Sequence, residues 1–158
     1  MITMELTFLK NLFPNHLIEI EVKEDNTEYA KIIHEEFDDI IKIFYYPGDY
    51  YEYYFSFATQ HRHTSDKNEL IEIIKSFINA EKAAIEFYLN GKNRFGGEIE
   101  VSLLDDITYE YFRQYYGYQN IDMSEYTFEV RAWNKRYCFN GSFEMTNSGK
   151  IAIVKNFL

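Results

Sequence analysis

Residues 44–55 read FYYPGDYYEYYF, and this stretch decides the expected fold. Pro47-Gly48-Asp49 is a turn signal between two aromatic segments, because proline fixes its own φ and glycine readily takes positive φ. Paired strands are therefore expected at 40–46 and 50–60. Alternate strand residues point to opposite faces. The set expected in the core is Tyr51, Tyr53, Phe55 and Phe57. The set expected to face water or a partner is Tyr50, Glu52, Tyr54 and Ser56.

Periodicity outside this stretch predicts further strands and helices. Residues 16–23 alternate as a strand, and residues 28–37 fit either a helix or a strand. A helix is expected at 66–79, because Asp66 or Ser65 can cap its first amides and its apolar residues share one face. A second helix is expected at 103–116, ended by Gly117.

The C-terminal third reads as an antiparallel meander from about residue 126 to 157. Asn140-Gly141 and Asn147-Ser148-Gly149 are expected as its turns, and Asn90-Gly91 as an earlier hairpin turn. The predicted fold class is α+β, mainly an antiparallel sheet with two or three helices packed on it. Only two prolines and no linker-like segment occur, so a single domain over residues 1–158 is expected.

Composition predicts a soluble, cytoplasmic protein. Hydrophobic residues make up 46% of the 158 residues and aromatic residues 19%, which is too apolar for a disordered chain. The start, MITMELTF, lacks the pattern of a signal peptide, and the apolar runs are far shorter than the roughly 20 residues that span a bilayer. Cys138 is the only cysteine, which excludes an internal disulfide.

The charge of −10 is concentrated at one end of the chain. Residues 1–60 hold 12 Asp and Glu against 4 Lys and Arg, whereas residues 61–158 hold 14 against 12. Such acidity opposes direct binding to nucleic acid or to an anionic membrane, and it favours a basic partner.

Catalytic signals are few, so a non-catalytic protein without a cofactor is expected. His61 and His63 are spaced to point the same way on a strand and could ligate a metal, with Asp66, His16 or His34 as a further ligand. The sequence has no Cys pair, HExxH or GxSxG motif to support such chemistry. A metal-dependent or acid–base enzyme that uses His61 and His63 is kept as an alternative.

Residues 40–100 resemble the central part of small bacterial immunity proteins. The likeness lies in the Tyr/Phe-rich strand, the capped helix, the segment AAIEFY at 83–88 and the segment NGKNRFGG at 90–97. Immunity proteins of this kind are encoded beside polymorphic toxins, including those of contact-dependent growth inhibition systems. The resemblance implies a protein that binds a cognate toxin domain, often a basic nuclease, and blocks it.

The residues expected to bind this partner combine carboxylates with exposed tyrosines. Carboxylates would pair with toxin Lys and Arg, and tyrosines would supply desolvated anchors. The set is Asp38, Asp39, Asp49, Tyr50, Glu52 and Tyr54. A second alternative with the same acidity is a phage-type inhibitor that mimics nucleic acid.

Overall fold

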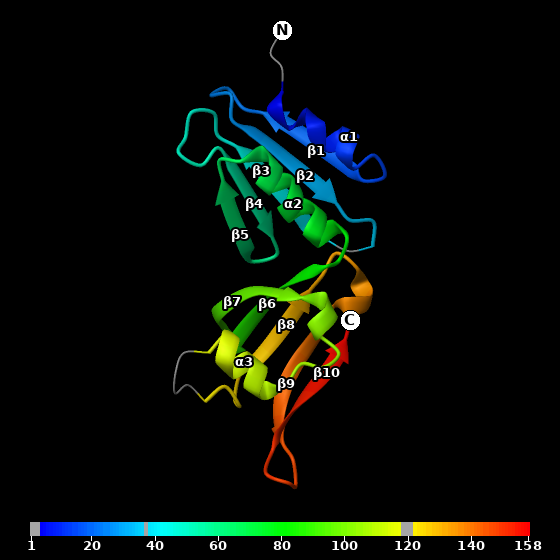
Figure 1. Ribbon diagram of the computed structural model, residues 1–158, viewed down its shortest axis with the longest axis vertical. Coiled ribbons are helices and arrows are strands. Elements are labelled where there is room, and N and C mark those ends of the chain that lie inside the picture. The colour runs from blue at the N-terminus through cyan, green and yellow to red at the C-terminus, as the bar shows by residue number, and fades with distance from the viewer. Residues whose placement is uncertain (1–3, 37, 118–121) are drawn as a thin grey trace. The chain divides into compact units, whose positions relative to one another are not determined.

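The computed structural model describes residues 4–36, 38–117 and 122–158. The chain divides into two compact units, unit 1 (Met1–Lys75) and unit 2 (Ser76–Leu158), and the division falls within α2 (Lys67–Ile78). Each unit contains one five-stranded antiparallel sheet, labelled in Figure 1. The α+β class is therefore confirmed, with two sheets where one was expected. The expectation of a single domain over residues 1–158 stays a prediction. It requires that the two units unfold together.

Sheet 1 of unit 1 is a meander in which each strand pairs with the next one along the chain. Its strands are β1 (Leu17–Val22), β2 (Glu28–Ile33), β3 (Ile40–Tyr45), β4 (Tyr53–Phe57) and β5 (Gln60–Thr64). The ambiguous segment is thus a strand as far as Ile33, because it pairs with a neighbour on each side. The segment expected as one strand at 50–60 holds β4 and a tight turn, and β5 begins at its last residue, Gln60.

One face of sheet 1 is covered and forms the core of unit 1. Its central strands contribute fully buried residues such as Ile43, Phe55 and Phe57. Figure 1 shows the N-terminal helical segment and α2 over this face. That N-terminal segment consists of η1 (Glu5–Thr7) and α1 (Phe8–Leu12), and it buries Leu6 and Leu9.

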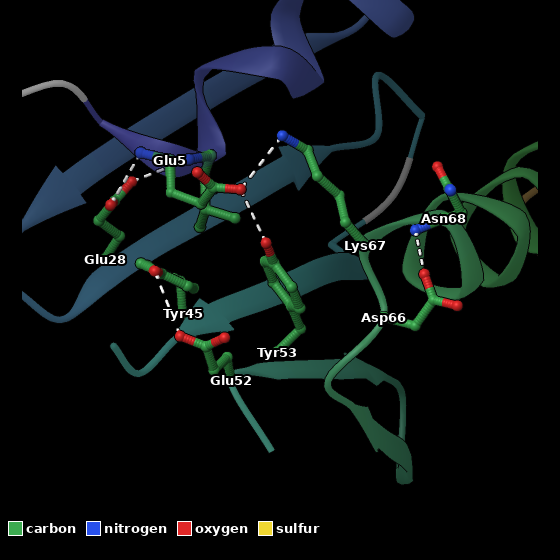
Figure 2. Close-up of polar contacts among 9 residues, drawn as sticks. Glu5, Glu28, Tyr45, Glu52, Tyr53, Asp66, Lys67 and Asn68 are labelled. Carbon is green, nitrogen blue, oxygen red and sulfur yellow. Dashed lines mark hydrogen bonds and ion pairs between the residues drawn. The ribbon is translucent and has the colours of Figure 1, made fainter. Parts of the chain in front are cut away.

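A polar cluster joins the N-terminal segment to the sheet (Figure 2). The buried carboxylate of Glu28 accepts hydrogen bonds from the backbone amides of Glu5 and Leu6, each at 2.9 Å. Glu5 in turn accepts a 2.7 Å hydrogen bond from the Tyr53 hydroxyl and forms a 3.1 Å ion pair with Lys67. Tyr53 is thereby held on the covered face, which directs its neighbour Tyr54 to the opposite face.

The Glu5 cluster predicts a loss of unit 1 stability in acid. Burial raises the pKa of Glu5, but the hydrogen bonds from Tyr53 and Lys67 and the charge of Lys67 outweigh it, so the net pKa lies below the ordinary 4.5. A carboxyl group whose pKa is lower in the folded state stabilises the fold at pH values above its unfolded-state pKa. This stabilisation is lost as the pH falls through the folded-state pKa. Glu5→Gln should therefore flatten the decline in unfolding free energy below about pH 4.5, measured by hydrogen exchange of unit 1 peptides. Glu24→Gln, at an exposed site in the β1–β2 turn, is the control. An unchanged acid decline in Glu5→Gln would contradict the prediction.

Sheet 2 of unit 2 has the strand order β10-β9-β8-β6-β7. Its strands are β6 (Lys82–Leu89), β7 (Lys92–Glu100), β8 (Thr127–Arg131), β9 (Phe139–Met145) and β10 (Ile151–Phe157). The short helical elements are η2 (Val101–Leu103), α3 (Tyr109–Tyr115) and η3 (Lys135–Tyr137). Phe112 of α3 packs on Phe128 and Phe87 of the sheet, at ring-centroid distances of 4.9 and 5.4 Å. No helix among the described residues has the length and apolar character needed to cross a bilayer.

Among the expectations for residues 66–158, several are confirmed and two are corrected. The helix at 66–79, the C-terminal meander and the turns at Asn90-Gly91 and Asn147-Gly149 are present. Asn140-Gly141 is not a turn, because both residues lie inside β9 and η3 lies in the connection that precedes it. The helix expected at 103–116 begins only at Tyr109, because Thr108 is extended and its side chain caps the amide of Tyr111.

Candidate functional site

The open face of sheet 1 carries a row of aromatic side chains that comes from four strands. Strand pairing places Tyr29 opposite Phe44, Phe44 opposite Tyr54, and Tyr54 opposite His63. These four residues, here called the aromatic row, lie on β2, β3, β4 and β5 in that order. Directly opposite side chains on one face are close neighbours, so the register alone brings the four rings together.

The rings of the aromatic row contact one another in sequence. Tyr29 stacks on Phe44 at 4.6 Å between centroids, and Phe44 meets Tyr54 edge-on at 6.2 Å. Tyr54 stacks on His63 at 6.0 Å and on His61 at 5.7 Å. Tyr29, Phe44 and Tyr54 are half-buried. His63 and the neighbouring His61 are exposed. Rings that already pack on each other have little conformational freedom left to lose when a partner binds.

The β3–β4 connection extends this surface beyond the strands. Tyr51 contacts His63 at 4.5 Å, and Tyr50 packs edge-on against Tyr51 at 4.7 Å while remaining 86% exposed. The prediction that Tyr51 lies in the core is therefore wrong, since its side chain is 45% exposed. Regular alternation starts only at Tyr53, because residues 47–51 form turns and bends. Tyr53, Phe55 and Phe57 are buried as predicted.

Carboxylates gather at the end of sheet 1 where the aromatic row lies. Unit 1 holds 15 Asp and Glu against 7 Lys and Arg, a net charge of −8. Burial raises the pKa of Tyr46, and so do Tyr54, Asp49 and Asp25, which places both carboxylates within electrostatic reach of this ring. Tyr46 stacks on Phe44 at 5.9 Å. The row is therefore bordered by negative charge from the β1–β2 and β3–β4 connections.

The next row of the same face has a different character. Lys31 and Lys42 lie opposite each other at its centre, with Glu19 on β1 and Ser56 and His61 on the other side. The open face therefore carries an aromatic row beside a row with two lysines, and its acidic groups lie mainly around the rim.

The structure brings only some of the six predicted binding residues together. Tyr54 belongs to the aromatic row, and Asp49 and Tyr50 are exposed in the adjacent connection. Glu52 instead turns into the hairpin, where its carboxylate accepts hydrogen bonds from the Tyr45 hydroxyl at 3.4 Å and the Gly48 amide at 3.3 Å.

Asp38 and Asp39 precede β3, whereas the aromatic row lies near the other end of that strand. Five residues of strand span about 17 Å. These two carboxylates are therefore separated from the tyrosines by most of the length of the sheet.

His61 and His63 contribute to the aromatic surface rather than to a metal-binding cluster. Tyr54 stacks on both imidazole rings, and Asp66 caps the first turn of α2 with a 2.9 Å hydrogen bond from the Asn68 amide (Figure 2). Among the described residues, no group of three or more His, Cys, Asp or Glu side chains is arranged to hold a metal ion. The metal alternative thus lacks its third ligand in that part of the chain.

The sequence did not indicate three members of the aromatic row as binding residues, namely Tyr29, Phe44 and His63. Phe44 begins the stretch 44–55, but it lies before the turn and outside the alternation that separates the two faces. Tyr29 lies in the segment 28–37, which fits either a helix or a strand. The available signal was the alternation of Tyr29, Lys31 and Ile33 against the buried Ala30 and Ile32. The sequence indicates His63 as a metal ligand or as part of an acid–base site, and not as part of an aromatic surface.

Unit 2 has a depression of its own on sheet 2. It measures about 430 Å³ and is lined by polar groups such as Thr127, Asn140 and Ser142, together with the ring of Tyr88. Its carboxylate Glu129 is already ion-paired with Arg131. The aromatic row joins rings from four strands, and it lies in the unit with the net charge of −8, so it is the better candidate site. Comparisons with protein-family models, with curated proteins and with solved structures find no match.

Proposed function

We propose that this protein is a toxin-neutralising immunity protein, which binds a basic toxin domain through the aromatic row of sheet 1 and blocks it. The observation that carries the proposal is the row itself, four half-buried or exposed rings that pack on one another on one face of sheet 1. Aromatic residues at the centre of an interface supply most of its binding energy. The net charge of −8 on unit 1 supports a basic partner, and the resemblance of residues 40–100 supports a toxin.

The aromatic row and the carboxylates that border it, such as those of Asp25 and Asp49, would have separate roles in binding. The row excludes water and supplies the slow dissociation that a neutraliser needs. The carboxylates around it attract the basic partner over distance and raise the association rate at low salt. A toxin that binds phosphates with Lys and Arg would present these same cations to the rim.

Substitution of Tyr54 by alanine is expected to weaken partner binding by about 2 kcal/mol, or about 30-fold, through faster dissociation. Tyr54 contacts Phe44, His61 and His63, so its removal opens the centre of the row. Ser56→Ala is the matched control, because Ser56 lies on the same face of the same strand, opposite Lys42 in the neighbouring row.

The partner is first captured from the native host on immobilised wild-type protein and eluted with high salt. Its dissociation from each purified variant is then measured by surface plasmon resonance. The captured protein must also arrest growth when expressed in bacteria, and co-expression of wild type, but not Tyr54→Ala, must restore growth. Equal dissociation from all three proteins, or a captured protein without toxicity, contradicts the proposal.

The position of a carboxylate relative to the row should decide its effect on association. Asp49→Lys places a cation beside the row and is expected to slow association about tenfold at low salt. Asp38→Lys makes the same change of charge at the other end of β3 and should slow association less. The difference should vanish at high salt, because exposed charges are screened. Equal effects of the two variants would show that only net charge matters.

A nucleic acid is the competing ligand, because rows of aromatic rings on sheets also stack bases. The charge of unit 1 opposes it, since the phosphates would meet a negative rim. Fluorescence anisotropy with a labelled single-stranded oligonucleotide separates the two ligands. Saturable binding that Tyr54→Ala abolishes would replace the toxin by a nucleic acid as the partner.

A further inference from the structure

The aromatic row ends in a depression at the β1 edge of sheet 1. The depression measures about 270 Å³ and is lined by Glu19, Ile20, Glu21, Tyr29 and Lys31. Glu21 lies opposite Tyr29 and Glu19 lies opposite Lys31, so two carboxylates of the edge strand line the depression together with the Tyr29 ring. The row therefore passes from stacked rings to a ring bordered by negative charge.

The side chains of this depression are suited to a cation. Alternate residues of a strand are about 7 Å apart, so the carboxylates of Glu19 and Glu21 can approach one bound group from two directions. Both are exposed, and neither forms an ion pair with another of the described residues. Below them, the face of Tyr29 attracts positive charge through its π-electrons.

The chain already places a cation of its own at this ring. The ammonium group of Lys31 lies 5.4 Å from the centroid of Tyr29. Phe44 also stacks on the Tyr29 ring, at 4.6 Å between the ring centroids. Lys31 thus shows that the ring accepts a cation, and the flexible four-carbon stem of lysine can move to make room for another one.

We propose that this depression binds a guanidinium group, namely an arginine side chain of the partner protein, in place of the Lys31 ammonium. The inference rests on the proposed function and names a recognition element of the same surface. Arginine fits better than lysine because its planar cation stacks on a ring and presents five N–H donors in a fixed geometry. One edge of the guanidinium would donate to Glu21 and another to Glu19, with charge-assisted hydrogen bonds.

Through Glu19 and Glu21, the edge strand β1 would contribute to the specificity of binding. An arginine in the depression would lie in register with the aromatic row, next to Tyr29. A partner that presents an arginine beside an apolar patch would therefore fill both parts of the surface together. A partner with the same net charge but no arginine at that position would be attracted equally well and held less tightly.

The test uses the full chain and three blocked tripeptides, acetyl-Gly-X-Gly-amide, in which X is arginine, lysine or citrulline. Citrulline has the shape of arginine without its charge. Titrations are followed by NMR signals of Tyr29 and of the Glu21 and Lys31 backbone amides. The arginine peptide should shift these signals saturably, the lysine peptide should bind roughly threefold more weakly, and the citrulline peptide should not saturate.

Variants then assign the effect to the depression. Glu21→Gln and Glu19→Gln should each weaken the arginine peptide roughly threefold or more, whereas Lys31→Met should strengthen it. Glu24→Gln removes an exposed carboxylate of the adjacent turn and should change nothing. Equal shifts with citrulline, or insensitivity to both Gln variants, would overturn the proposal.

The same variants separate this proposal from the proposed function. If Tyr54→Ala weakens the captured toxin but Glu21→Gln does not, the immunity function stands and the arginine site is wrong. If the arginine peptide binds as expected but no toxin is captured, the arginine site stands and the identity of the partner is wrong.

Discussion

Alanine in place of Gly141 is expected to destabilise unit 2 by about 3 kcal/mol, because it overfills the core. Gly141 lies inside β9 directly opposite Phe128 of β8, and a Cβ atom built on it would overlap the Phe128 ring. That ring cannot move aside easily, since it is 1% exposed and packs on Phe112 at 4.9 Å and on Phe143 at 5.4 Å. Interiors packed at native density do not absorb an extra methyl group without strain.

The loss is measured by urea unfolding followed through the fluorescence of Trp133, the only tryptophan, which is buried in unit 2. Ser142→Ala, one residue away and half-buried on the open face, should change stability by less than about 0.5 kcal/mol. In a double-mutant cycle, Gly141→Ala should cost much less when Phe128 is also alanine, because the two groups compete for one space. Additive effects would mean that the methyl group clashes with something else.

The same experiment tests the single-domain expectation. Hydrogen exchange of unit 1 peptides is measured in Gly141→Ala alongside the unfolding of unit 2. If the two units unfold as one cooperative body, protection in unit 1 should fall by the same free energy as in unit 2. Protection that stays unchanged in unit 1 would show two independent domains.

Alanine in place of Glu28 should destabilise the N-terminal helical segment of unit 1 by about 3 kcal/mol. The Glu28 carboxylate is buried and accepts hydrogen bonds from the amides of Glu5 and Leu6, at the start of η1. The preceding residue, Met4, offers no side-chain cap, so truncation leaves two amide donors without their acceptors. Leu6 and Leu9, which are fully buried, would lose their anchor to the sheet.

Hydrogen exchange of peptides from residues 4–13 measures this loss directly. Glu28→Gln retains one acceptor oxygen and should lose about half as much. Glu21→Gln, in the neighbouring strand but on the open face, should leave the exchange of this segment unchanged. Exchange in Glu28→Ala that matches wild type would show that apolar contacts alone hold the segment.

The strands and the core were predictable where local patterns agreed with the final pairing. Alternation placed Tyr53, Phe55 and Phe57 in the core correctly, because β4 is regular over those residues. It failed at Tyr51, where the backbone is still part of the turn. The Asn-Gly signal succeeded at Asn90-Gly91 and failed at Asn140-Gly141, because the second glycine makes room for a ring and does not turn the chain.

The candidate site was predictable only in part, for a physical reason. Tyr54 and Asp49 lie close together in the sequence and stay close in the structure. Tyr29, Phe44 and His63 join Tyr54 only through the register of three strand pairs, and a shift of one residue would turn any of them to the covered face. Register depends on packing across the whole sheet, which no local segment specifies.

The sequence by itself determined the α+β class, most of the strands, the capped helix and the concentration of negative charge toward one end. These follow from period, turn chemistry and composition, which are local or additive properties. The tertiary structure decided the use of each acidic side chain. Glu28 is buried as a cap for a distant helix, Glu52 closes a hairpin, and Glu19 and Glu21 remain exposed beside Tyr29. Identical carboxylates differ in these roles because strand pairing sets their burial and their neighbours.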